Sequence, residues 1–162
     1  MSAQACPVPD NALMQRYVGQ GATYTDCYRV EVQQQVSLSE FVTAFYTTPL
    51  FRAERLILSM ALRKRIHDGD IDAMLSGRAR TFAIWHVEEQ SEDELLVCDA
   101  KDATRSWFSV MPLAQGGTAL HFGSVVVAHQ GRPLPKIVKY TTPLHIFYAR
   151  SLLNAARRRL LM

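Results

Sequence analysis

Histidines and a short acidic run come nearest, by residue type and spacing, to a metal site or a catalytic centre. His86 and Glu88 match the first half of a zinc deaminase signature, yet the cysteine pair that completes it does not follow. His121 and His129 share one side of a predicted strand, where eight residues separate them by about 26 Å. One metal ion cannot bridge that distance, so neither pair predicts a metal site.

The acidic run from Asp68 to Asp72 begins like a calcium-binding loop, with an aspartate at every second position. Such a loop ends on a glutamate that binds calcium through both carboxylate oxygens, and the corresponding residue here is Ala79. We therefore expect these acids to cap a helix or to stay solvated. Together with the histidines, they lead us to expect no metal and no cofactor.

The three cysteines, Cys6, Cys27 and Cys98, are an odd number at wide spacings and contain no C-x-x-C pair. This pattern does not predict a disulfide framework. Cys98 lies in an apolar predicted strand, where a cysteine usually serves as a small buried hydrophobic residue. A reactive thiol would need a neighbour that lowers its pKa, and the sequence shows none.

A second set of candidates consists of aromatic and polar-tipped residues on three predicted elements. Side chains of this kind line cavities that hold ring-shaped or amphipathic ligands. The same residue types also fill ordinary protein cores, so ligand binding and core packing are alternatives for each of them. The candidate ligand-binding residues are Tyr28, Trp85, Trp107, Met111, His121, Phe147 and Tyr148. No residue is assigned a catalytic role.

His145 is predicted to lie in the first turn of the last helix, because Thr142 and Pro143 form a typical helix start. At that position the helix dipole favours a neutral, hydrogen-bonding ring. We expect a structural role for His145 at this helix end in preference to catalysis.

The elements that position these residues begin with a strand over residues 24–36, in which apolar and polar side chains alternate. Ser37 and Glu40 match the capping box of a helix, and apolar residues then recur at helical spacing as far as Pro49. Residues 50–66 show a second helical pattern, with basic residues near its end. The first half of the chain is therefore expected to be a strand followed by two helices.

Four strands are predicted in quick succession, over residues 81–90, 94–100, 105–113 and 118–130. Two turns, Ser91–Asp93 and Gln115–Gly117, make hairpins of this antiparallel meander. A helix with a broad apolar arc follows from Pro143 to about Leu160. Only the concave side of the meander is large enough to cover that arc, so we expect an α+β fold with a long C-terminal helix on an antiparallel sheet.

The chain has the length and composition of one domain. Its 162 residues are 48% hydrophobic, which is enough to bury a core without disulfides. We expect residues 1–23 to form a flexible or irregular lead-in and residues 24–162 to form the domain. The N-terminus lacks the features of a secretory signal, and no apolar run approaches the roughly 20 residues of a membrane span. These features favour a cytoplasmic protein without integral membrane association.

Charge is distributed unevenly along the chain, although the net charge is only +3. Seven acids and one base lie between Glu88 and Asp102, whereas residues 131–162 contain seven bases and no acid. The arginines at 157–159 either complement the dipole of the last helix or contact anionic lipid or an acidic partner. The acidic hairpin disfavours nucleic-acid binding. Homodimer formation through exposed strand edges is left open.

Five short motifs occur in an order that resembles the START-like superfamily of helix-grip proteins. They are Tyr24–Asp26, Phe45–Pro49, Trp85–Glu88, Ser106–Val110 and Pro143–Phe147. Over residues 24–155 the chain is most similar to a bacterial family of unknown function within this superfamily. Because the superfamily includes lipid-transfer domains and polyketide cyclases, the resemblance implies a hydrophobic cavity between the last helix and the sheet. A full helix grip has six strands after the helices, and a missing pair near residues 66–80 would make the cavity shallower or more open.

Three functions follow from these observations. The first is the binding of a small hydrophobic or amphipathic ligand, a lipid or an aromatic metabolite, in the cavity. The second is an enzyme of the cyclase or isomerase kind that uses His121 or His86 together with Arg105 in the same cavity. The third is a peripheral membrane or partner-binding role for the basic C-terminal helix.

Overall fold

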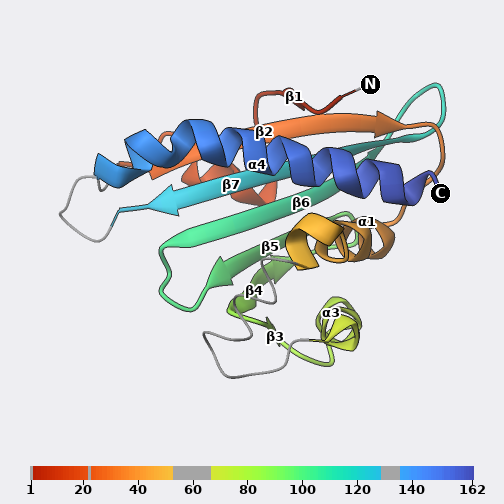
Figure 1. Ribbon diagram of the computed structural model, residues 1–162, viewed down its shortest axis with the longest axis horizontal. Helices are drawn as coiled ribbons and strands as arrows, with labels where there is room; N and C mark the ends of the chain where they lie inside the picture. The colour runs from red at the N-terminus through yellow and green to blue at the C-terminus, as the bar shows by residue number, and fades with distance from the viewer. Residues whose placement is uncertain (1, 22, 53–66, 129–135) are drawn as a thin grey trace.

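An antiparallel sheet and a long C-terminal helix form the α+β fold of this chain (Figure 1). The computed structural model describes residues 2–21, 23–52, 67–128 and 136–162. Within these ranges the sheet has seven strands, in the order β1-β2-β7-β6-β5-β4-β3. Helix α4 lies along one face of the open sheet. This arrangement is of the helix-grip kind, and it confirms the fold class predicted from the sequence.

The helices and strands follow one another along the chain in the order β1 (Gln4–Ala5), the 3-10 helix η1 (Leu13–Tyr17), β2 (Thr23–Val32), α1 (Leu38–Tyr46), α3 (Asp68–Leu75), β3 (Thr81–Phe82), β4 (Trp85–Gln90), β5 (Glu94–Asp99), β6 (Thr104–Pro112), β7 (Thr118–Val127) and α4 (Lys136–Leu160). No helix in the described ranges is both long and apolar enough to span a membrane.

The capping box predicted at the start of α1 is confirmed. The Ser37 hydroxyl accepts a hydrogen bond from the backbone N–H of Glu40, and the Glu40 carboxylate accepts one from the backbone N–H of Ser37. These two bonds satisfy backbone donors that an open helix end would leave free. The second predicted helix, residues 50–66, lies for the most part outside the described residues.

Both predicted hairpin turns are confirmed, since Ser91–Asp93 join β4 to β5 and residues 113–117 join β6 to β7. Gly117 has a φ of 90°, a left-handed conformation that glycine adopts without strain. A Cβ at this position would also collide with the carbonyl oxygen of Val32. Glycine is therefore needed where the turn passes the end of β2.

The predicted strand over residues 81–90 is wrong in one respect, because a turn divides it into β3 and β4. Ala83, with a φ of 54°, lies in this turn, and the two strands pair with each other in antiparallel. An alanine gives no sequence signal for such a turn. Residues 66–80, where a strand pair of the full helix grip was expected to be missing, contain α3. At the start of that helix, Asp70 accepts a hydrogen bond from the backbone N–H of His67.

Helix α4 begins at Lys136, about two turns earlier than the predicted start at Pro143. Proline is most common in the first turn of a helix, but here the helix continues through it. His145 consequently lies inside α4 and not in its first turn. The expectation that His145 lies in the first turn, where the helix dipole acts on its ring, is therefore wrong.

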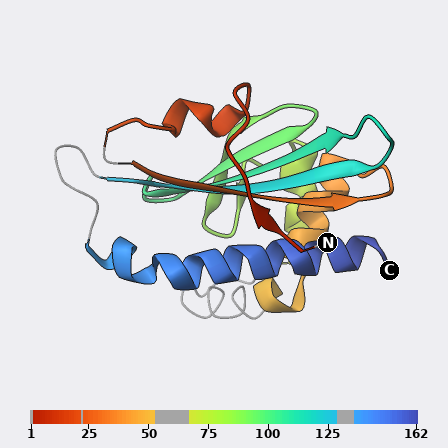
Figure 2. The same cartoon turned by 90° about the horizontal axis from the view of Figure 1, so that it is seen from above.

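Two layers cover the sheet, with α1 and α4 on one face and η1 on the other (Figure 2). The first layer encloses the larger core, in which the ring of Phe108 lies 5.0 Å from that of Phe45 and 5.3 Å from that of Phe122. The smaller core, beneath η1, contains the fully buried Met14 and Trp107. The segment expected to be a flexible or irregular lead-in thus contains β1 and η1 and packs against the sheet.

Candidate functional site

A cavity of about 240 Å³ lies between α4 and the sheet, and we call it the α4 cavity. Helix α4 contributes His145, Tyr148, Ala149 and Leu152 to its lining. The other described residues that line it are Phe45, Tyr46, Phe51, Trp85, Thr104, Arg105, Ser106, Phe122, Ser124, Val125 and Val126. A mostly apolar lining with a few polar groups is typical of small-molecule sites.

The spacing of the α4 residues explains why they share the cavity. Positions 148, 149 and 152 lie three, four and seven residues after 145, so the four residues lie on one face of the helix. Ala149 is 1% exposed and has only a methyl group to offer. A small side chain at the centre of this face leaves space between helix and sheet.

Trp85, which lines the α4 cavity, carries a hydrogen-bond donor that lacks an acceptor. Its Nε1 atom is buried and has no hydrogen-bond partner in the part of the chain that the structure describes. A buried polar atom left without a partner costs roughly 1–3 kcal/mol, and native proteins pair nearly all such atoms. An acceptor placed against the indole N–H would remove this cost.

The carboxylate of Asp26 organises a group of polar side chains at the cavity. Its Oδ2 atom accepts hydrogen bonds from the hydroxyls of Tyr24, at 3.0 Å, and Tyr28, at 3.2 Å. Its Oδ1 atom accepts one from the backbone N–H of Ser124, at 3.1 Å. Nε2 of His145 lies 3.3 Å from Asp26 Oδ2 and 3.1 Å from the hydroxyl oxygen of Ser124. Strand and helix thus meet through one buried acid.

The two tyrosines keep the Asp26 carboxylate fixed. Burial, followed by the negative charge of Asp26, raises the pKa of Tyr24 and of Tyr28 above that of a free phenol. Both hydroxyls are consequently protonated at neutral pH and donate to the carboxylate. The side chain of Asp26 is only 10% exposed, so its orientation is set by these donors and not by solvent.

A histidine oriented by a carboxylate is a group that proteins use to form hydrogen bonds and to move protons. Both contacts of His145 use Nε2, whereas a catalytic triad engages the two ring nitrogens separately. The arrangement therefore does not activate Ser124 as a nucleophile. It gives the cavity a polar end that suits hydrogen bonding or proton transfer.

Two of the seven candidate ligand-binding residues, Trp85 and Tyr148, line the α4 cavity. Tyr28 lies in the same core, where its hydroxyl contacts Asp26. Phe147 is on α4 but is 70% exposed, so it points away from the sheet. The sequence therefore predicted one lining residue on the meander, Trp85, and one on the helix, Tyr148.

Trp107, Met111 and His121 lie on the opposite face of the sheet, beneath the layer of η1 or at its margin. Trp107 is fully buried, and its Nε1 donates to Glu94 at 2.6 Å. Burial, followed by the charge of Arg29, lowers the pKa of His121 to about 4. Alternation along a strand shows which residues share a face of the sheet, but it does not show which face a distant helix covers. The sequence therefore could not show that these three residues lie on the face opposite α4.

Arg105 and His86, which were candidates for an enzymatic role, also form their contacts away from α4. Arg105 Nε donates to Glu88 at 3.1 Å, and its guanidinium lies 5.1 Å from the ring centre of Tyr17 in η1. His86 Nε2 lies 4.0 Å from Asp102. Arg105 is among the residues that line the α4 cavity, but its guanidinium contacts Glu88 and Tyr17, and neither His121 nor His86 lines the cavity. The predicted combination of His121 or His86 with Arg105 inside the cavity is therefore not supported.

Sequence reasoning did not identify Asp26, Ser124 or the contact that His145 makes with them. One signal was present, because Asp26 occupies the apolar side of its strand between Tyr24 and Tyr28. An acid on the buried side of a strand needs donors. The partner on α4 depends on tertiary packing and has no counterpart in the local sequence.

The basic end of α4 is in part a packing feature. Arg157 Nε donates to the backbone carbonyl of Glu31 at 3.1 Å, whereas Arg158 and Arg159 are exposed. Arg157 therefore stabilises the packing of α4 against β2.

In comparisons with known proteins, no family model matches the chain and no curated protein matches its sequence.

Proposed function

We propose that the protein binds a small hydrophobic or amphipathic molecule in the α4 cavity, as a member of the START-like superfamily would. The observation that carries this proposal is the buried indole N–H of Trp85, a residue that lines the mostly apolar cavity, because this N–H lacks an acceptor among the described residues. A ligand with an oxygen or nitrogen acceptor would satisfy it. The apolar lining would supply most of the binding free energy.

The volume of the cavity favours certain ligands over others. At about 240 Å³ it lies just below the roughly 300–1,000 Å³ of typical small-molecule sites. A single aromatic ring system or a short acyl chain suits that volume better than a lipid with two long chains. The rings of Trp85 and Tyr148 in the lining favour a flat ligand.

Calorimetric titration of the full chain with a panel of aromatic carboxylates and medium-chain fatty acids tests the proposal. Trp85→Phe keeps an aromatic ring and removes the N–H, so we expect about a tenfold loss of affinity, or about 1.4 kcal/mol. Trp107→Phe is the matched control, because Trp107 lies on the other face of the sheet. Its affinity should equal that of the wild type.

A second pair of variants tests the location of the ligand. Val126→Phe adds bulk to the cavity lining and should abolish binding, whereas Val127→Phe adds the same bulk at the next residue, outside the lining. Both residues are half-buried, which makes the substitutions comparable. Absence of binding across the panel, or equal effects of the two variants, contradicts the proposal.

An enzyme of the isomerase kind is the second candidate, and the contact between Asp26 and His145 at the cavity favours it. Such an enzyme would remove a proton from a carbon next to a ketone and return it elsewhere. Incubation with cyclic ketones in deuterated water would show exchange at that carbon by NMR. Exchange should be lost in His145→Gln and retained in His67→Gln, a variant at an exposed histidine outside the cavity. Equal exchange in both variants contradicts an enzymatic role for His145.

A further inference from the structure

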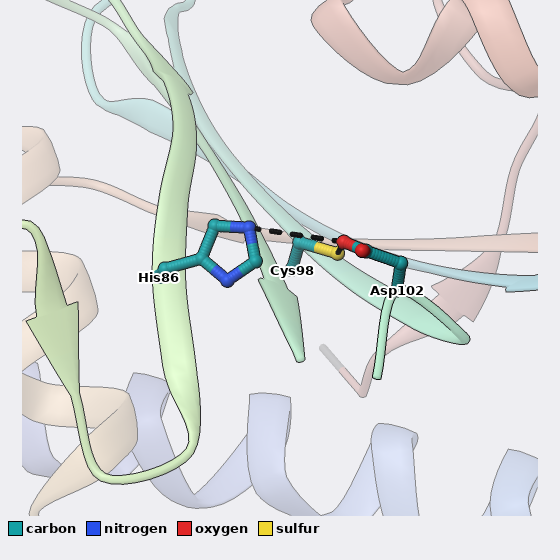
Figure 3. A group of neighbouring side chains, drawn as sticks. All are labelled: His86, Cys98 and Asp102. Atoms are coloured by element: carbon teal, nitrogen blue, oxygen red, sulfur yellow. Dashed lines mark hydrogen bonds and ion pairs between the residues drawn. The ribbon is translucent and has the colours of Figure 1, made fainter. Parts of the chain in front are cut away.

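Three side chains with metal-binding atoms converge on the face of the sheet opposite α4 (Figure 3). His86 lies on β4, and Cys98 is its direct partner on β5. Asp102 lies in the turn that leads to β6. One nitrogen, one sulfur and one oxygen from these residues all lie within 4.8 Å of one another.

The separations are close to those in a tetrahedral zinc site. Cys98 Sγ lies 3.2 Å from Asp102 Oδ1, and His86 Nε2 lies 4.0 Å from the same oxygen. Bond lengths of about 2.0–2.3 Å from zinc to nitrogen, oxygen and sulfur place tetrahedral ligand atoms roughly 3.3–3.6 Å apart. Small side-chain rotations would therefore bring all three atoms to bonding distance of one ion.

We propose that His86, Cys98 and Asp102 form a zinc site with three protein ligands. An imidazole, a thiolate and a carboxylate are donors that zinc accepts, and a sulfur ligand disfavours calcium and magnesium. Three protein ligands leave the fourth position open to water. The site lies outside the α4 cavity and goes beyond the function proposed for that cavity.

The turn that carries Asp102 is held in place by its neighbour Asp99. The Asp99 carboxylate accepts hydrogen bonds from the backbone N–H groups of Ala103, at 2.9 Å, and Lys101, at 3.2 Å, and from the Thr104 hydroxyl, at 3.1 Å. Asp102 itself has a φ of 54°, a conformation that residues other than glycine seldom adopt. The carboxylate is thus presented to Cys98 by an ordered turn, as a metal ligand requires.

Charge and access are also compatible with a divalent cation. A thiolate and a carboxylate together neutralise the two positive charges of zinc. The nearby Arg105 is balanced by Glu88, which accepts a hydrogen bond from it. The side chains of His86 and Asp102 are 40% and 75% exposed, so an ion can reach the buried Cys98 between them. The Cys98 thiol donates a hydrogen bond to Asp102, and zinc would take the place of that proton, which is released to solvent.

Metal titration of the chelator-treated full chain tests this site. Zinc affinity is measured by competition with a chromophoric chelator, and cobalt(II) reports sulfur coordination through its thiolate charge-transfer absorption. We expect one ion per chain in the wild type. His86→Gln, at a half-exposed position, and Cys98→Ser should each weaken zinc binding by at least about tenfold.

Cys6 and Cys27 provide the matched control, because they are the other two cysteines of the chain and their sulfur atoms lie 3.3 Å apart, away from Cys98. The double variant Cys6→Ser/Cys27→Ser should bind zinc as the wild type does and keep the cobalt–thiolate absorption. The proposal would be overturned if the double variant lost that absorption and Cys98→Ser kept it. Zinc affinity unchanged by both His86→Gln and Cys98→Ser would overturn it as well.

Discussion

The face of the sheet that packs against α1 and α4 buries a cluster of aromatic rings. The carboxylate of Asp26 lies at the edge of this core, where it contacts Tyr28 and His145. The face beneath η1 has a smaller apolar core, around Met14 and Trp107, bordered by charged and polar contacts. There Glu94 pairs with the indole of Trp107 and Glu88 pairs with Arg105. The first face therefore suits an apolar ligand, whereas the second suits an ion.

The length of the covering helix accounts for this difference. A helix of 25 residues shields its face of the sheet over a long distance, so apolar side chains can fill the space beneath it. The 3-10 helix η1 has five residues and covers much less. Polar groups near its margin remain close to water and must each find a partner.

The largest effect is expected from the aromatic core. Phe108→Ala removes a fully buried ring that lies within 6 Å of Phe41, Phe45, Tyr46 and Phe122. We expect a loss of about 4 kcal/mol in the free energy of unfolding, measured by urea denaturation. Met111→Ala, at a half-buried residue of the same strand on the other face, should cost about 1 kcal/mol. Similar losses for the two variants would contradict the contrast between the faces.

A smaller effect is expected from the pH dependence of His121. Its pKa is about 4 in the folded chain, whereas an unfolded histidine titrates near pH 6.5. As the pH falls from 6.5 to 4, the unfolded chain takes up a proton that the folded chain does not bind. Stability from the neutral ring is therefore complete above pH 6.5, and roughly 3 kcal/mol of it is lost by pH 4.

Urea midpoints between pH 7 and pH 4.5 measure this effect. His121→Gln should flatten the decline in stability, and His67→Gln, at an exposed histidine, should leave it as in the wild type. A wild-type decline that persists in His121→Gln would show that another group causes it.

The smallest effect is expected where η1 touches the sheet. A Cβ at Gly123 would collide with the sulfur of Met14 and lie 3.0 Å from the backbone oxygen of Asp26. Gly123→Ala should therefore cost about 1–2 kcal/mol and loosen η1. In a Met14→Ala background the added cost should be smaller, because the methionine sulfur is no longer in the way. Equal costs in both backgrounds, measured by urea denaturation, would show that η1 does not pack as closely as the structure indicates.

Local patterns were sufficient to predict the fold class. Alternation on β2, the capping box at Ser37 and the two hairpin turns are features of short segments, and each was readable from neighbouring residues. The start of α4 and the turn at Ala83 were missed, since the helix passes through Pro143 and alanine rarely adopts a positive φ.

The candidate site was predictable only in part. Trp85 and Tyr148 were identified by residue type, but the assignment of Trp107 and His121 to the same cavity required knowledge of which face α4 covers. The acid Asp26 and its partner His145 are more than a hundred residues apart, so only the folded chain brings them together. The same holds for His86 and Cys98, which become neighbours through strand pairing.

Tryptophan fluorescence tests the central claim most directly, because one of the two tryptophans lines the α4 cavity and the other lies on the opposite face. Bromine-substituted benzoate and decanoate quench a tryptophan only when they lie against it. In Trp107→Phe, which retains Trp85, we expect saturable quenching. In Trp85→Phe, which retains Trp107, we expect none. Quenching of Trp107 with no effect on Trp85 would contradict a ligand site beneath α4.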